Sequence, residues 1–200
     1  MLKELRRCSL ARIQVEEPEV EEQMSSGNFE NSVLPHLDAA YNLARWLTRN
    51  EQDAEDAVQE ACLRAYKFFN AFRGRNARAW LLKIVRNTCY TQVRNNRPQE
   101  LARFDEEIHS EDDGSTNPET LLMRGGDSQL LRRALEELPM KFRELLVLRE
   151  LEGFSYREIA EVSDIPQGTV MSSLSRARER LRQSLTSLLN KNAAREATPS

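Results

Sequence analysis

A run of 27 residues with seven basic side chains and no acidic one is the feature that most constrains this chain. It extends from Ala71 to Arg97, in a protein whose formal net charge is -3. From about Ala77 its apolar residues recur with helical period, and Pro98 cannot continue a helix. The segment therefore predicts a long amphipathic helix. A basic segment within an acidic protein indicates a phosphate-bearing partner at that place.

The basic side chains of this predicted helix share one strip. At 100° per residue, the strip contains Lys83, Arg86, Tyr90, Arg94 and Arg97. The opposite face, which we expect to be buried, contains Leu81, Leu82, Val85, Cys89 and Val93. Cations along a strip can follow the backbone of a single nucleic-acid strand while an aromatic side chain stacks on its bases. An ordinary solvated helix face is the alternative, and this helix alone does not decide between them.

Composition favours an all-α protein. Seven glycines and seven prolines in 200 residues, with long runs of helix formers, leave few candidate strands. No apolar run approaches the roughly 20 residues needed to cross a bilayer, so we expect a cytoplasmic protein without membrane insertion. The three cysteines and two histidines lack zinc-ligand spacing. We therefore expect neither a metal site nor a cofactor.

Changes in composition divide the chain into five parts. We predict a flexible acidic tail over residues 1–28, a helical domain over 29–97, an acidic flexible linker over 98–127, a second helical domain over 128–190 and a tail over 191–200. The linker has a net charge of about minus seven, together with turn-forming residues, which argues against packing. Two small helical domains are the predicted architecture.

The first domain also carries an acidic helix face. A helix that begins near Asn50 places Asp53, Asp56, Gln59 and Glu60 three and four residues apart. The helix dipole accounts well for Asp53 in the first turn, but less well for Gln59 and Glu60, which lie further in. Phenylalanines follow this helix, where they belong either to the core or to a base pocket.

The second domain has the pattern of a helix-turn-helix. Ser155 and Glu158 form a capping-box sequence, and a short helix ends at Asp164-Ile165-Pro166. The long helix that follows contains Arg176, Arg178, Arg180 and Arg182 with Glu179 as the acidic residue among them. Two helices joined by a three-residue turn, the second one basic, are typical of DNA-binding domains. A purely structural helical hairpin is the alternative.

Two segments in this order resemble the extracytoplasmic-function group of bacterial RNA polymerase sigma factors. DAEDAVQEACLRAYKFFNAF, followed by WLLKIVRNTCYTQVR, is similar to region two of the family. LPMKFRELLVLRELEGFSYREIAEVSDIPQGTVMSSLSRARERLR is similar to its region four. The resemblance covers roughly residues 30 to 190. It implies a non-enzymatic initiation factor that binds core RNA polymerase and promoter DNA, directs transcription of a stress or envelope regulon and is held by an anti-sigma factor.

The resemblance also implies roles for individual residues. The residues that would bind polymerase are Asp53, Asp56, Gln59 and Glu60. The residues that would bind the minus-ten element are Phe72, Arg73, Arg75, Arg78, Trp80, Lys83, Arg86, Asn87, Tyr90, Arg94 and Arg97. The residues that would bind the minus-thirty-five element are Tyr156, Thr169, Met171, Ser172, Ser173, Ser175, Arg176, Arg178 and Arg180. Met171 and Ser173 stand where many members of the family have Lys or Arg.

Two other classes of protein fit parts of the sequence. A stand-alone helix-turn-helix regulator leaves residues 53 to 97 unexplained. A nucleic-acid enzyme would need a metal-ligand set, an HExxH motif or a Walker loop, and the sequence contains none of these.

Overall fold

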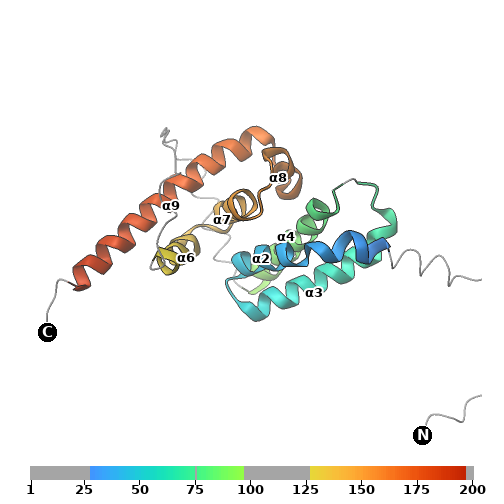
Figure 1. Ribbon diagram of the computed structural model, residues 1–200, viewed down its shortest axis with the longest axis horizontal. Coiled ribbons are helices and arrows are strands. Elements are labelled where there is room, and N and C mark those ends of the chain that lie inside the picture. The colour runs from blue at the N-terminus through green and yellow to red at the C-terminus, as the bar shows by residue number, and fades with distance from the viewer. Residues whose placement is uncertain (1–27, 75, 97–126, 197–200) are drawn as a thin grey trace, which may run out of the picture.

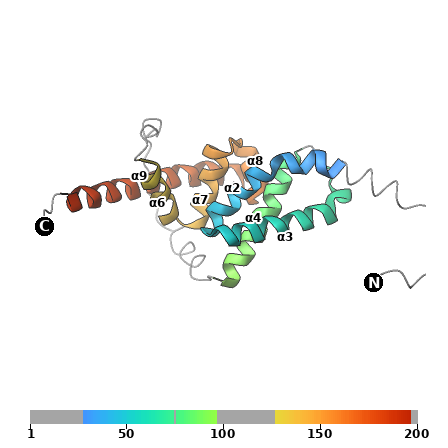
Figure 2. The same cartoon turned by 60° about the horizontal axis from the view of Figure 1, so that its bottom comes forward.

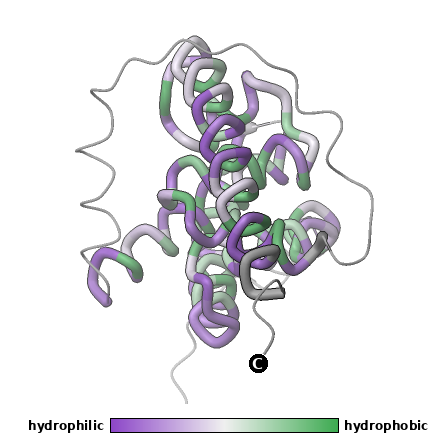
Figure 3. Tube along the Cα trace, turned by 90° about the vertical axis from the view of Figure 1, so that its left-hand side faces the viewer, coloured by the Kyte–Doolittle hydropathy of each residue, from purple (hydrophilic) through white to green (hydrophobic). Residues whose placement is uncertain are grey.

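The computed structural model describes residues 28–74, 76–96 and 127–196, and within these ranges the chain forms helices and turns without a strand (Figure 1). The predicted all-α fold with two helical parts is confirmed. Hydrophilic and hydrophobic residues alternate along the helices (Figure 3), which is the pattern expected of helices with one buried face.

The first helical unit is a small bundle. Residues 28–33 are helical, and the elements that follow are η1 (Leu34–His36), α2 (Leu37–Thr48), α3 (Glu51–Phe68), η2 (Phe69–Ala71) and α4 (Ala77–Asn96). The side chain of Asn50 caps α3 by accepting a hydrogen bond from the backbone N–H of Asp53 over 3.0 Å. Ala54, Ala57 and Ala61 are fully buried on α3, and their small side chains allow α2 and α4 to approach closely.

The second helical unit contains α6 (Asp127–Glu137), α7 (Met140–Leu146), the π-helical turn η3 (Val147–Leu151), α8 (Tyr156–Ser163) and α9 (Gln167–Glu196). Ser155 and Glu158 form the predicted capping box at the start of α8. Gly153 adopts φ +69° between η3 and α8, a conformation that glycine adopts without steric cost. Figure 1 shows α9 running beyond the rest of the unit as a long arm.

The end of α9 differs from the prediction. The helix continues to Glu196, so residues 191–196, which the sequence analysis assigned to a tail, are helical. Between Gly168, in the first turn of α9, and Pro199 the sequence contains no glycine or proline, and the helix can therefore continue past the residues that pack.

The two units pack against each other. α4 lies along α8, and α2 contacts α7 and η3 (Figure 2). Buried side chains from both units belong to one hydrophobic cluster. The predicted tail over residues 1–28 lies outside the described residues except for residue 28, and the predicted linker lies outside them except for Asp127. The structure therefore does not test either prediction.

Candidate nucleic-acid interface

The predicted acidic face of α3 is exposed. Asp56, Gln59 and Glu60 are exposed, whereas Asp53 is half-buried in the first turn of the helix. Glu60 Oε1 accepts a hydrogen bond from Arg64 Nε over 2.7 Å, and both side chains remain about half exposed. An ion pair of this kind contributes about 0.3–0.5 kcal/mol, so it leaves the carboxylate available to a partner.

Two apolar side chains extend this face. Leu63 is 68% exposed and Tyr66 is 51% exposed. Each lies seven residues, or close to two helical turns, after a member of the acidic face, Asp56 and Gln59 respectively. The sequence analysis did not assign them to a site, although the seven-residue spacing was present in the sequence. The face thus combines carboxylates with exposed apolar side chains, a composition suited to a protein partner.

An aromatic cluster occupies the end of the first unit, before α4. Phe72 stacks on Trp80 with ring centroids 4.6 Å apart and an interplanar angle of 26°. Phe69 lies 6.4 Å from Phe72 and 6.3 Å from Trp80. Gly74 lies beneath the ring of Phe72, and a Cβ added there would come within 2.6 Å of that ring. Because Phe72 and Trp80 are half-buried, part of this aromatic surface belongs to the core and part faces outward.

The arginines near this cluster differ in their surroundings. Arg73 is exposed and donates to the carbonyl oxygen of Asn70 over 2.6 Å. Arg78 donates to the Glu152 carboxylate over 2.5 Å and to its backbone oxygen over 2.9 Å, and its guanidinium lies 4.6 Å from the ring centroid of Phe154. Arg75 lies outside the described residues. Arg78 is therefore bound to the second unit, not presented to solvent as a member of an open basic surface.

The basic strip of α4 is covered at its centre. The predicted buried face is confirmed, because Leu81, Leu82, Val85, Cys89 and Val93 are all buried. Lys83 Nζ lies 3.4 Å from Asp164 Oδ1, and Arg86 Nε lies 2.8 Å from Glu144 Oε1. The prediction of a continuous strip that faces solvent is therefore wrong for the central residues in this conformation. Helical period cannot reveal that α7 and α8 supply carboxylates to the same side of the helix.

The outer parts of this strip remain accessible. Asn87 and Arg94 are exposed, and Asn87 Oδ1 accepts a hydrogen bond from Arg86 over 3.0 Å. Arg97 lies outside the described residues.

Glu144 is the centre of the contact between the units. Its side chain has no exposed surface, and it accepts hydrogen bonds from Tyr90 Oη over 2.6 Å and from Ser163 Oγ over 2.5 Å, besides the bond from Arg86. A buried carboxylate is tolerated when a cation and hydrogen-bond donors surround it, as these three side chains do. The Arg86 guanidinium also lies 4.5 Å from the ring centroid of Tyr90.

This environment shifts the protonation of the two α4 side chains. Burial raises the pKa of Tyr90 well above 10, and the adjacent Glu144 carboxylate raises it further. Burial of Arg86 lowers its pKa, but the attraction of Glu144 outweighs this effect and leaves the pKa raised. Arg86 therefore remains a cation and Tyr90 remains a neutral hydrogen-bond donor, the two forms that a buried carboxylate requires.

The start of α9 presents the predicted DNA-reading face in part. Thr169, Met171, Ser172 and Ser175 are exposed, and Arg176 is half-buried. These side chains begin within the first turn of the second helix of the helix-turn-helix, where recognition helices contact base edges.

Four other members of the predicted minus-thirty-five set are placed differently. Ser173 is only 8% exposed, so its prediction as a surface contact is wrong for this conformation. Arg178 pairs with Glu150 over 2.7 Å, which raises the pKa of Arg178 against the opposing effect of its burial. Arg180 lies 5.4 Å from the ring centroid of Phe142, and Tyr156 lies under Arg149 at 4.8 Å. A helical wheel does not show these contacts, because each depends on a residue from another element.

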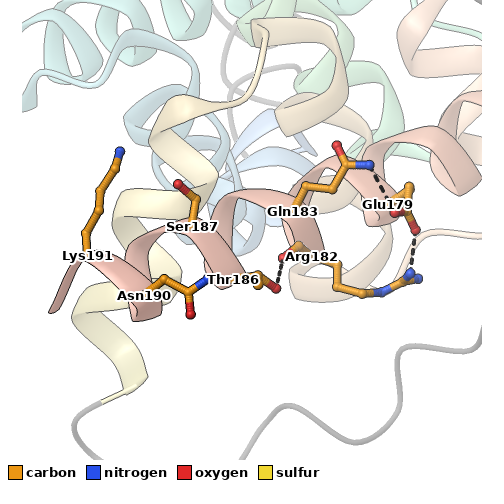
Figure 4. A pocket seen from close by; sticks show the side chains of 7 residues that line it. All are labelled: Glu179, Arg182, Gln183, Thr186, Ser187, Asn190 and Lys191. Atoms are coloured by element: carbon orange, nitrogen blue, oxygen red, sulfur yellow. Dashed lines mark hydrogen bonds and ion pairs between the residues drawn. The ribbon is translucent and has the colours of Figure 1, made fainter. Parts of the chain in front are cut away.

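The second unit also has two hollows. One, of about 220 Å³, is mainly apolar and lies between α6, the end of α7, η3 and α9, where Leu131, Leu146 and Leu181 line it. The other is an open depression whose lining, among the described residues, comes from α9 between Glu179 and Lys191 (Figure 4). Its side chains bond within the helix, as Gln183 does with Glu179 over 3.1 Å, so it does not enclose a ligand.

Within the described residues, no group of three or more metal-ligating side chains is close enough to hold an ion. The helices described here are all too short or too polar to span a membrane.

A helix-turn-helix in one unit and a basic helix in the other are the features of a DNA-binding protein. Comparison with protein families identifies Sigma-70 region 2 over residues 33–99 and Sigma-70 region 4 over residues 128–181. The chain is 36% identical to the ECF RNA polymerase sigma-E factor of Escherichia coli (strain K12) over 147 residues, which cover 70% of this chain and 77% of that protein. It is 34% identical to the sigma-E factor of Haemophilus influenzae, covering 74% of this chain and 81% of that one.

Two solved structures are similar as well. One is the sigma factor RpoE in complex with the anti-sigma factor NepR from Bartonella quintana, with a TM-score of 0.61, 32% identity and coverage of 80% of this chain and 97% of that one. The other is CnrH in complex with the cytosolic domain of CnrY, with a TM-score of 0.56, 26% identity and coverage of 84% and 94%.

The chain belongs to the extracytoplasmic-function (ECF) group of bacterial RNA polymerase sigma factors. It is a non-enzymatic initiation factor that binds core RNA polymerase, directs it to specific promoters and helps to open the promoter DNA. The predicted family, function and absence of enzymatic activity are thereby confirmed, and both rival classes are excluded.

Proposed function

We propose that three separate surfaces divide the steps of promoter-dependent initiation. The exposed face of α3 binds the largest subunit of core polymerase, the strip on α4 with the aromatic cluster binds the minus-ten element, and the exposed start of α9 reads the minus-thirty-five element. The observation that carries this assignment is the position of the three surfaces on different helices. Because they do not overlap, one chain can engage polymerase and two DNA elements together.

The polymerase contact combines acidic and apolar groups. Asp56, Gln59 and Glu60 supply carboxylates and an amide, while Leu63 and Tyr66 supply exposed apolar area beside them. Interfaces typically depend on a few anchors of this kind, among which tyrosine is over-represented. The adjacent charges steer the encounter and determine its orientation.

At the minus-ten element, binding drives strand opening. Unstacking a base pair step costs a few kcal/mol, and a captured base that stacks on an aromatic side chain recovers about 1–3 kcal/mol. Phe72 and Trp80 provide aromatic surface next to the exposed Arg73, and Arg94 continues the positive charge along α4. Lys83, Arg86 and Tyr90 join this surface when the second unit moves away.

At the minus-thirty-five element, the start of α9 enters the major groove. Thr169, Met171, Ser172 and Ser175 are already exposed there, and Arg176 borders them. An arginine with two hydrogen bonds to guanine contributes about 1–3 kcal/mol of discrimination. Arg178 reaches a phosphate only after it leaves Glu150.

An anti-sigma factor is the proposed regulatory partner. One similar solved structure is a complex of the sigma factor RpoE with the anti-sigma factor NepR, and the other is a complex of CnrH with the cytosolic domain of CnrY; this chain resembles both over most of its length. The sigma-E relatives support a stress or envelope-response regulon as the target. Because core polymerase and chromosomal DNA are its partners, we place the protein in the cytoplasm.

The affinity for purified core polymerase, measured in a pull-down, tests the α3 assignment. Asp56→Arg should weaken core binding by about tenfold or more, since a loss of 1.4 kcal/mol is tenfold in affinity. Leu63→Ala should weaken it in the same direction without a change in charge. Glu136→Arg, an equal charge reversal on α6, is the control and should bind core normally. Equal core affinity of Asp56→Arg, Leu63→Ala and the control would refute the α3 assignment.

A further inference from the structure

The contact between the two units is electrostatically one-sided. Side chains of the first unit donate hydrogen bonds and oxygen atoms of the second unit accept them. The contacts are Asn42 to Glu152 (3.3 Å), Arg49 to the Leu138 carbonyl (3.2 Å), Asn76 to Glu158 (2.8 Å), Arg78 to Glu152 (2.5 Å), Lys83 to Asp164 (3.4 Å), and Arg86 (2.8 Å) and Tyr90 (2.6 Å) to Glu144. The second unit thus presents an acidic surface to the basic side of α4.

Four of the seven donors in this contact are groups expected to hold DNA. Arg78, Lys83, Arg86 and Tyr90 all belong to the proposed minus-ten surface. A carboxylate and a phosphate offer the same donors anionic oxygens in similar geometry. A strand therefore cannot bind Arg86 while Glu144 holds it, and the two contacts exclude each other.

We propose that the closed packing of the two units is a self-inhibited state, in which Glu144, Glu152 and Asp164 occupy the positions of promoter phosphates on α4. This inference rests on the proposed role of α4 in binding the minus-ten element. The exposed carboxylate of Asp164 marks the edge of the contact, and the buried carboxylate of Glu144 marks its centre.

The other proposed surfaces remain open in the closed packing. The acidic and apolar face of α3 is exposed, and so is the start of α9. Core polymerase can therefore bind before the α4 strip is released. A sigma factor that binds polymerase and two spaced DNA elements must separate its units, so polymerase binding would favour the open state by its differential affinity. The free protein stays closed, and the polymerase complex exposes α4.

The test opens the packing with substitutions confined to the second unit. The triple variant Glu144→Gln, Glu152→Gln and Asp164→Asn keeps side-chain shape while it removes three negative charges. Asparagine is suitable at position 164, because this residue has φ +59° and asparagine tolerates that conformation.

A matched control removes equal charge from the same unit without touching the contact. The variant Glu136→Gln, Glu161→Gln and Glu179→Gln neutralises carboxylates that pair with arginines of their own helices. Any general gain in DNA affinity from lost negative charge will appear in both variants.

Two measurements are made on the full-length protein without polymerase. Small-angle X-ray scattering gives the radius of gyration, and fluorescence anisotropy gives the affinity for a fluorescein-labelled single-stranded DNA of random sequence. The triple variant should have a larger radius of gyration than the control and bind this DNA about tenfold more tightly or better. Apparent affinity rises in proportion to the population of the competent state.

The possible failures are distinguishable through Arg94, which is exposed in the closed packing. If the triple variant neither expands nor binds more tightly than the control, while Arg94→Ala weakens binding, self-inhibition is refuted and the proposed role of α4 stands. If the triple variant expands but does not bind the DNA more tightly than the control, while Arg94→Ala still weakens binding, self-inhibition is likewise refuted and the proposed role of α4 stands. If Arg94→Ala has no effect even in the triple variant, the proposed role of α4 fails and this inference fails with it.

Folding is checked by circular dichroism. Should the triple variant fail to fold, the double variant Glu152→Gln and Asp164→Asn retains the buried Glu144. For the double variant we expect the same increases in radius of gyration and DNA affinity, but smaller ones. If neither quantity increases relative to a control with two charges removed, the inference is refuted.

Discussion

Arg86→Ala tests the pairing at the centre of the closed packing. The substitution removes the cation from Glu144, a carboxylate without exposed surface, and leaves it with the hydroxyls of Tyr90 and Ser163. Breaking a buried ion pair from one side costs about 3–5 kcal/mol. Because two donors remain, we expect a loss of about 3 kcal/mol in the free energy of unfolding. The loss cannot exceed the free energy that holds the units together, since their separation would return Glu144 to water.

A double-mutant cycle isolates the interaction. Urea unfolding is followed by the fluorescence of Trp46 and Trp80 for the wild type, Arg86→Ala, Glu144→Gln and the double variant. Glu144→Gln leaves the Arg86 cation, which is 16% exposed and still donates to Asn87 Oδ1, so it should cost less than Arg86→Ala, which leaves a carboxylate without exposed surface. The double variant should be close to Glu144→Gln alone, which corresponds to a coupling energy of about 3 kcal/mol, the full cost of Arg86→Ala.

The pair Arg132–Glu136 on α6 is the control for the cycle. It is partly exposed, with 3.0 Å between Arg132 Nε and Glu136 Oε1, and should give a coupling energy of about 0.3–0.5 kcal/mol. An equally small coupling energy for Arg86 and Glu144 would refute the reasoning. It would mean that the carboxylate meets water in solution and that the units do not close as described.

Three further predictions concern single groups. Spectrophotometric titration should show that Tyr90, one of the four tyrosines, ionises well above pH 10, and that Glu144→Gln lowers the pKa of Tyr90. Because folding raises this pKa, the contribution of Tyr90 to stability is complete below pH 10 and is lost as the pH rises through the pKa of the folded state. A titration in which no tyrosine ionises late would contradict this prediction. Burial raises the pKa of Cys89 to about 12, so iodoacetamide at pH 8 should label it only after urea unfolding, and rapid labelling of the native protein would show that the site opens. Gly74→Ala should lower the free energy of unfolding by about 1 kcal/mol and change tryptophan fluorescence, because the new Cβ displaces the ring of Phe72; unchanged values would show that the ring moves without cost.

Local signals in the sequence predicted much of the fold. The helix predicted to begin near Asn50 is α3, which Asn50 caps, and Ser155 and Glu158 form the predicted capping box. These features depend on residues within one turn of each other, so the sequence contains all the information they need. The buried face of α4 was predictable for the same reason, because helical period alone determines it.

The contact between the units was not predictable in this way. Arg86 and Tyr90 carry donors that suit a phosphate and a carboxylate equally well. Which anion they meet depends on Glu144, which lies far away in the sequence and is buried despite its charge. Ser173 and Arg178 were misplaced for a similar reason, since their burial and pairing depend on residues of other helices. Family resemblance assigns a function to such residues without indicating the conformation in which they are free to perform it.

Covering the α4 strip has a physical consequence for a DNA-binding protein that works only with polymerase. An exposed strip of cations binds any duplex or strand through its phosphates, and a genome offers about 10⁶–10⁹ such sites. The chain as a whole has a net charge of -3, which by itself opposes that binding, yet charge acts locally and an open strip would still attract DNA. The carboxylates of Asp164 and Glu144, paired with Lys83 and Arg86, remove the local attraction for DNA while the basic residues stay in place. Since the α3 face stays exposed, the proposed closed state would let the free protein meet polymerase first, and its affinity for the minus-ten strand would be released only where polymerase has already placed it.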